Sequence, residues 1–159
     1  WTEIANQCSG RNAQGLSVWK PNSTPSSSGV VTATFSSSPS EAAISVSRYS
    51  GATTTGNIAK ANTNGVNGAC SGGTDSTSPA VNLTTTSANS FAFGAVAKRN
   101  RTFTPGSGFA ERADFDSGGG GSAAGIAIED KGISSPSTFS VYGTTSGITD
   151  WAIVAVEIK

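Results

Sequence analysis

The sequence lacks histidine and methionine altogether, and only 13% of its 159 residues are charged. Without histidine the chain has no ordinary general base, no imidazole metal ligand and no Ser-His-Asp or Cys-His arrangement. Ten basic residues balance ten acidic ones, so no long-range field attracts nucleic acid or anionic lipid. No apolar run approaches the roughly 20 residues of a membrane span. We therefore expect no enzyme, no cofactor, no nucleic-acid partner and no membrane span.

Cysteine is scarce as well, with only Cys8 and Cys70. One pair in a chain rich in serine and threonine favours an oxidising compartment and a single disulfide. The alternative is two unpaired buried thiols. Three Asn-X-Ser/Thr sequons, at Asn22, Asn82 and Asn100, are candidates for surface glycosylation and also favour export. We expect the protein to be extracellular or on the cell surface.

The residues that are present alternate between apolar and polar, with period two, and no window has a helical period. The pattern predicts about ten short strands, at residues 1–7, 16–20, 30–36, 41–49, 80–86, 90–98, 109–114, 123–130, 138–143 and 151–158. Loops are expected at 50–79 and 116–122. Strands without intervening helices predict an all-β fold, a jelly-roll-type antiparallel sandwich that forms one domain over residues 1–159.

Two parts of the chain resemble each other. The stretch "GLSVWK" at 15–20 parallels "GIAIED" at 125–130, and "EAAISVS" at 41–47 parallels "DWAIVAVE" at 150–157, both at a spacing of 110. "WTEI" at 1–4 parallels "FAER" at 109–112 at a spacing of 108, and Phe35 matches Phe139. The order and spacing predict two related half-domains, approximately 1–50 and 80–159. Convergent strand patterning is the alternative.

The second half has two further predicted strands, at 80–98, ahead of its "FAER", and the first half has no counterpart of them. If the halves are equivalent, part of one sheet must come from elsewhere: from a segment upstream of Trp1 or from a neighbouring subunit. Trp1 and Ile4 are then candidates for a subunit interface, with other copies of this chain as the partners.

The stretch "TFTPGSGFAERADFDSGGGGSAAGIAIEDK", the ending "DWAIVAVEIK" and the earlier "AAISVSRYSGA" together resemble a widespread family of secreted or virion-associated prokaryotic β-domains. The resemblance covers nearly the whole chain and implies a lectin-like jelly-roll sandwich. Its motifs are turn glycines and core aromatics, so it implies architecture, adhesion or assembly rather than a reaction. Residues 49–53, "YSGAT", lack the acidic residue that the family usually carries at this turn.

Acidic residues offer two weak candidate sites. Asp114 and Asp116 share a strand face beside a glycine-rich stretch and could hold Ca²⁺, although the 12-residue calcium-loop pattern is absent and solvated charges explain them as well. Glu111 and Glu129 could be cast as a glycosidase pair, but the chain has few aromatic residues to line a sugar groove. Trp19 and Trp151 are better explained as packing residues.

The only basic cluster is "AKRNRTF", with Lys98, Arg99 and Arg101. It could bind a sulfated or phosphorylated glycan or nucleic acid, but a solvated hairpin tip is the simpler interpretation. "GGGG" at 118–121 lacks the strand–glycine–helix order of a phosphate-binding loop.

These patterns favour a structural subunit of an extracellular filament, pilus or surface layer, whose protomers complete one another's sheets. The alternative is a carbohydrate-binding or adhesive module of a secreted or phage-tail protein, for which Tyr49, Tyr142 or Trp19 are possible platforms. The first predicts large contacts between chains that include backbone ladders. The second predicts exposed aromatic side chains beside polar loops.

Overall fold

The computed structural model describes residues 1–24 and 28–159. Eleven strands and one short 3₁₀ turn, η1 (Gly120–Ser122), make up the described fold, which contains no α-helix in these residues. All described strand pairs are antiparallel. The prediction of an all-β antiparallel sandwich is confirmed, while its jelly-roll connectivity stays a prediction. Among the described residues no helix is long and apolar enough to cross a bilayer.

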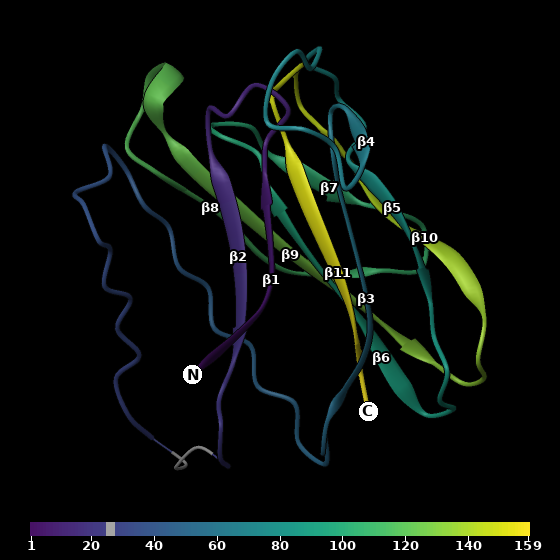
Figure 1. Ribbon diagram of the computed structural model, residues 1–159. Helices are drawn as coiled ribbons and strands as arrows, with labels where there is room; N and C mark the ends of the chain where they lie inside the picture. Colours follow the sequence, from purple (N-terminus) through teal and green to yellow (C-terminus); the bar gives the residue numbers. More distant parts are fainter. Residues whose placement is uncertain (25–27) are drawn as a thin grey trace.

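A six-stranded sheet forms the centre of the molecule (Figure 1). Its order is β4 (Gly65–Val66), β3 (Thr55–Asn62), β11 (Ala152–Ile158), β6 (Ser90–Ala97), β9 (Ala124–Ile133) and β8 (Ala110–Ser117). Strand β11 is apolar on both faces because both are covered, and Ile153, Val154 and Ala155 are each 0% exposed.

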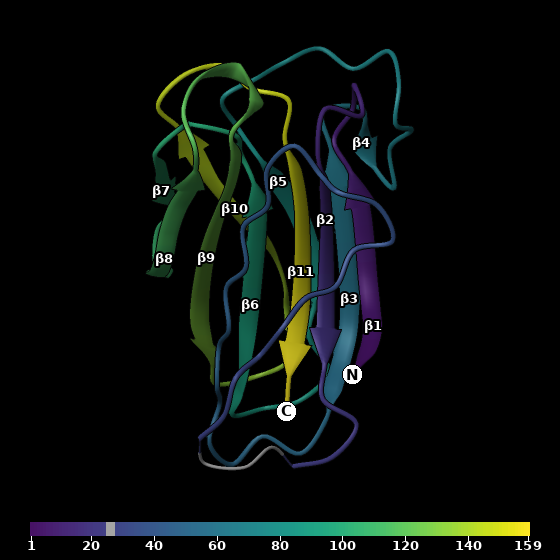
Figure 2. The ribbon, with the colours of Figure 1, turned by 90° about the vertical axis from the view of Figure 1, so that its left-hand side faces the viewer.

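Smaller sheets cover the two faces of this central sheet (Figures 1 and 2). On one face lie β5 (Ala80–Thr84), β10 (Thr138–Thr145) and β7 (Phe103–Pro105), whose Leu83, Val141 and Phe103 pack into one apolar core. On the other lies the hairpin of β1 (Thr2–Cys8) and β2 (Gly15–Lys20), which places Leu16 and Val18 in a second core. The sandwich therefore has three layers rather than two.

The two hairpins at the matched sequence positions share their register, and the two related halves stay a prediction. In β1–β2, Thr2 lies opposite Lys20 and a bulge falls between Glu3 and Ala5. In β8–β9, Ala110 lies opposite Asp130 and a bulge falls between Glu111 and Ala113. These positions differ by the same 108 and 110 residues as the sequence match. A shared register and a shared bulge are more specific than alternation alone, because a bulge is a defined departure from it.

Several predicted elements were wrong. Residues 30–36 and 41–49 form no strand in the described chain, whereas 55–62 and 65–66, predicted as loop, form β3 and β4. The short strand β7 was not predicted, and 116–122 begins inside β8. Alternation marks a segment that can become a strand, but a ladder also needs a neighbouring strand. Strand β3 pairs with β11 and β4, whereas no strand pairs with 30–36 or 41–49 in the described chain.

Candidate functional site: an uncovered layer

The outer face of the β1–β2 hairpin carries two exposed tryptophans. Trp19 lies opposite Glu3 in the register, and Trp1 shares the strand face of Glu3. Trp1 is 55% exposed and Trp19 is 52% exposed. The interpretation of Trp19 as a packing residue was therefore wrong for the isolated chain, whereas Trp151, at 6% exposed, is a core residue.

The equivalent face of the second hairpin is largely covered, although Glu111, the counterpart of Glu3, stays exposed. Trp1 corresponds to Phe109, which packs against the core and against Phe139 of β10 with 6.4 Å between ring centroids. Trp19 corresponds to Glu129, which is 0% exposed. In the second half, then, β10 covers a face that stays open in the first half.

The segment that corresponds to β10 is residues 30–36, and it lies in solvent. Phe35, the counterpart of Phe139, is 55% exposed, and Val30 is 93% exposed. No ring contact links Phe35 to Trp1 among the described residues, although their counterparts Phe139 and Phe109 touch. The trace of residues 28–50 runs beside the hairpin without joining its sheet (Figures 1 and 2).

Residues 41–49 also form no strand in the described chain. Ile44 and Val46 are 55% and 58% exposed, whereas their counterparts in β11, Val154 and Val156, are 0% and 1% exposed. The segment is held at its ends. The Ser117 hydroxyl donates to Glu41, and the Tyr49 hydroxyl donates to Asp130 at 2.9 Å.

Tyr49 anchors the end of this segment on the central sheet. Its ring packs on Phe91 and Phe93, with centroids 5.3 and 6.5 Å away. Burial raises the pKa of the Tyr49 phenol, and its bond to Asp130 raises it further. Because Tyr49 is committed to these contacts, it is a poor sugar platform. Tyr142, at 38% exposed, is a more accessible ring.

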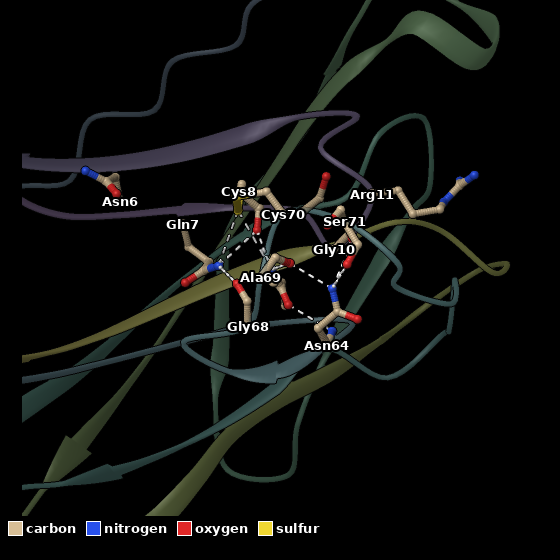
Figure 3. Close-up of a disulfide and its surroundings, with 12 residues drawn as sticks. Asn6, Gln7, Cys8, Gly10, Arg11, Asn64, Gly68, Ala69, Cys70 and Ser71 are labelled. Carbon is tan, nitrogen blue, oxygen red and sulfur yellow. Dashed lines mark hydrogen bonds between the residues drawn. A yellow bond between two sulfur atoms is a disulfide. The ribbon is translucent and has the colours of Figure 1, made fainter.

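A polar network and a disulfide fasten the hairpin to the sandwich at its other end (Figure 3). Cys8 and Cys70 form the predicted disulfide. The amides of Asn62 and Asn64 donate to carbonyl oxygens around it, including those of Gly68, Ala69 and Ser71. These contacts fix one end of the β1–β2 hairpin, which carries Trp1 and Trp19, against the rest of the fold.

The buried carboxylate of Asp150 belongs to the same network. It accepts hydrogen bonds from the Ser9 hydroxyl at 2.7 Å, from the Arg11 and Ala13 backbone N–H groups, and from the Thr63 hydroxyl. The Gln14 side chain donates to its backbone oxygen. A 0% exposed carboxylate with this many donors holds the turn of the hairpin against β11.

The remaining predicted sites lie elsewhere. The side chains of Asp114 and Asp116 converge, as predicted, but on the ammonium of Lys98, at 2.7 and 2.6 Å. Lys98 is 0% exposed, so it is no hairpin tip, and it already supplies the positive charge that a Ca²⁺ ion would bring. Within the described ranges no group of three metal-ligating side chains is present.

Glu111 and Glu129 do not face each other across a cleft. They are opposite residues on adjacent strands, with Glu111 exposed and Glu129 fully buried. Neither carboxyl oxygen of Glu129 has a hydrogen-bond partner in the described part of the chain. Burial raises the pKa of Glu129 to about 8. Burial dominates this shift and outweighs the opposing effect of the Gly106 backbone N–H. The geometry of a glycosidase pair is missing.

The candidate glycosylation sites differ in access. Asn22 and Asn82 are exposed, and Asn100 is partly buried. Ile4, a predicted interface residue, packs against the second core instead and is only partly accessible. Of the two interface candidates, Trp1 alone presents a largely free side chain.

No protein-family model, curated protein or solved structure matches this chain. The chain belongs by its fold to the class of all-β antiparallel sandwiches. The resemblance to secreted and virion-associated β-domains stays an expectation.

Proposed function

We propose that this chain is a structural subunit of an extracellular filament, pilus or surface assembly, in which a neighbouring copy covers the Trp1–Trp19 face of the β1–β2 hairpin. One observation carries the proposal: the tryptophans of this face are exposed, whereas their counterparts in the β8–β9 hairpin, Phe109 and Glu129, are covered in part or in full. Exposed apolar faces and unpaired strand edges favour association with another chain.

The donor that fits best is residues 30–36 of the neighbouring copy. This segment corresponds to β10, alternates in the manner of a strand and is exposed throughout in the isolated chain. A serine- and proline-rich stretch, "SSSPS" at 36–40, separates it from residues 41–49. In the assembly, Phe35 of one copy packs against Trp1 of the next, as Phe139 packs against Phe109 within the chain.

Burial supplies the driving force. Trp1 and Trp19 of the acceptor face and Val30 and Phe35 of the donor segment are all more than half exposed. Covering these four side chains contributes on the order of 4–8 kcal/mol before the cost of association. The contact is head to tail, since the donor and acceptor surfaces differ, and head-to-tail contacts that do not close form filaments.

A mixing experiment tests the proposal. A Trp1→Ser/Trp19→Ser variant keeps the donor segment and loses the acceptor face, and a Phe35→Ser variant does the reverse. We expect the wild type to form long assemblies by light scattering and electron microscopy. Each variant alone is expected to stay monomeric, and the mixture of the two to form a one-to-one complex.

Val66→Ser is the matched control, because Val66 is 68% exposed but lies on the far edge strand β4. It should assemble as the wild type does. If the wild type is monomeric at every concentration tested, or if the mixture forms no complex while each variant remains folded, the proposal is wrong. Monomers in which 30–36 is protected from amide exchange would mean that the segment covers its own hairpin instead.

A carbohydrate-binding or adhesive module remains a second candidate, favoured by the same two tryptophans. Exposed aromatic rings on a flat strand face bind the apolar faces of sugars, and Trp1 and Trp19 flank the polar Glu3. Binding to a glycan array that is lost in the double tryptophan variant, together with a monomeric wild type, would support this function over the first.

A further inference from the structure

A pocket at the end of the sandwich gathers two arginines of the basic cluster. Its volume is about 310 Å³, and Arg99, Asn100, Arg101, Gly121, Ile148 and Thr149 are among the residues that line it. The connection between β6 and β7 supplies the arginines, and the turn at η1 supplies the glycine. This pocket is separate from the tryptophan face and does not depend on the proposed assembly.

The backbone fixes the position of Arg99. Its φ is +56°, a left-handed conformation that few non-glycine residues adopt. The Arg99 N–H donates to the Gln14 side chain, and Gly125 lies so close to the Arg99 carbonyl oxygen that a Cβ there would clash with it. A strained backbone conformation that the surrounding structure holds in place is typical of functional sites, where it fixes the position of a side chain.

The guanidinium of Arg99 has no hydrogen-bond or ion-pair partner in residues 1–24 and 28–159. One of its terminal nitrogens lies against Gly121, at 3.2 Å from the place where a Cβ would be. Arg101 is directed into the same region by a bond from its Nε to the Ile148 carbonyl oxygen. Two guanidinium groups thus line one pocket, and that of Arg99 is unpaired.

The charge around the pocket is positive. Its one carboxylate, Asp75, is already paired with Arg11, at 2.7 Å from Arg11 Nε. Lys98, the remaining cation of the cluster, is turned into the fold toward Asp114 and does not contribute. An anion that entered would therefore meet uncompensated guanidinium groups, which bind planar or tetrahedral oxyanions through two parallel hydrogen bonds.

We propose that this pocket binds the carboxylate or sulfate group of an acidic saccharide. The volume is about ten times the ~30 Å³ share of one water molecule, so it admits a sugar ring together with its charged group. Asn100 offers a neutral polar group to hydroxyls, and Ile148, at 64% exposed, offers an apolar surface. A nucleic acid fits less well, because the balanced charge of the chain gives no extended basic track.

Calorimetric titration of the unmodified protein with galacturonate, galactose 6-sulfate, galactose and inorganic sulfate tests this proposal. We expect at least one of the two acidic sugars to bind and neutral galactose not to bind. Inorganic sulfate should bind at least tenfold more weakly than the acidic sugar. Arg99→Gln and Arg101→Gln should each weaken binding at least tenfold. Arg112→Gln, which removes an arginine paired with Asp130 on the central sheet, should change it less than twofold.

Gly121→Asp is a second route to the same answer, because it brings a carboxylate next to Arg99 and should block the pocket without removing an arginine. Circular dichroism checks that each variant is folded. Equal binding of inorganic sulfate and the acidic sugars would mean an adventitious anion site only. Equal binding to all variants, no binding of either acidic sugar, or tighter binding of a single-stranded oligonucleotide than of both sugars would overturn the proposal.

Discussion

Two fully buried glutamates, Glu157 and Glu129, have pKa values shifted in opposite directions. The carboxylate of Glu157 accepts bonds from the Thr86 and Ser87 backbone N–H groups at 2.8 Å and from the Thr86 hydroxyl. Burial raises its pKa, but these donors outweigh burial, and the net pKa is lowered. Glu129 has no such donors in the described chain, and its pKa is raised to about 8.

Glu129 should make the protein less stable as the pH rises. Between pH 4.5 and about 8 the folded state holds a proton on this carboxyl that the unfolded state has lost. The free energy of unfolding therefore falls with pH in this interval, by at most about 1.4 kcal/mol per unit from this group. Glu129→Gln should remove that slope and stabilise the protein near pH 8. Urea unfolding across the interval measures it.

Glu157→Gln is the matched comparison. It replaces an acceptor of several backbone bonds by a neutral amide that also brings two donors, so it should destabilise the fold by about 1–3 kcal/mol at neutral pH. If Glu129→Gln keeps the slope of the parent protein, the unpaired burial of Glu129 is not its cause.

Lys98 gives a second prediction at the level of single residues. Lys98→Met removes the ammonium that Asp114 and Asp116 share, and the side chains of these aspartates are only 17% and 31% exposed. Leaving two close carboxylates without their cation should cost on the order of 3 kcal/mol in chemical unfolding. Lys60→Met, which removes a surface lysine bonded to one backbone oxygen, should cost much less. Added Ca²⁺ should not shift the unfolding midpoint of the parent protein.

At the scale of elements, the β1–β2 hairpin is a separate two-stranded sheet that covers part of the central sheet. It pairs with no other strand in the described chain, and Cys8–Cys70, with a sequence separation of 62, ties it down at one end. Removing this cross-link by Cys8→Ser/Cys70→Ser should cost up to ~4 kcal/mol. Amide exchange should rise first in β1 and β2, while β6 and β11 stay protected.

Asp150→Asn is the companion change, because it weakens the other attachment of the hairpin without touching the disulfide. It should raise exchange in the same two strands. Equal loss of protection in β11 and in the hairpin would contradict the view of β1–β2 as a separately attached element.

The elements also show how far the sequence could predict the fold. Alternation located eight of the eleven strands, including β11, whose apolar run is typical of a strand covered on both sides. It missed β3, because "TGNIAKAN" mixes polar and apolar residues on both faces, and it also missed the short strands β4 and β7. It wrongly assigned residues 30–36 and 41–49, because their alternation does not reveal whether a partner strand lies within reach.

The candidate site was only partly predictable for the same reason. The repeat in the sequence pointed to Trp1, but the exposure of Trp19 depends on what covers the hairpin, which no local pattern contains. Similarly, the run Lys98-Arg99 reads as one basic cluster. In the fold a left-handed turn at Arg99 separates a buried lysine from an arginine in a pocket.

At the scale of the whole molecule, the two parts of the chain that match in sequence and in hairpin register are covered to different extents. The second half is closed by β10, and the first leaves its tryptophan face and the segments 30–36 and 41–49 open. A neighbouring copy that supplies residues 30–36 would give both halves the same layers. The free chain is then a precursor whose last layer forms on assembly.

Hydrogen exchange of the native assembly, compared with dissociated subunits, tests this claim most directly. The account predicts that amides of residues 30–36 exchange quickly in free subunits and become protected to the level of β10 in the assembly. Fast exchange of these residues in both states, with β10 protected in both, would contradict it.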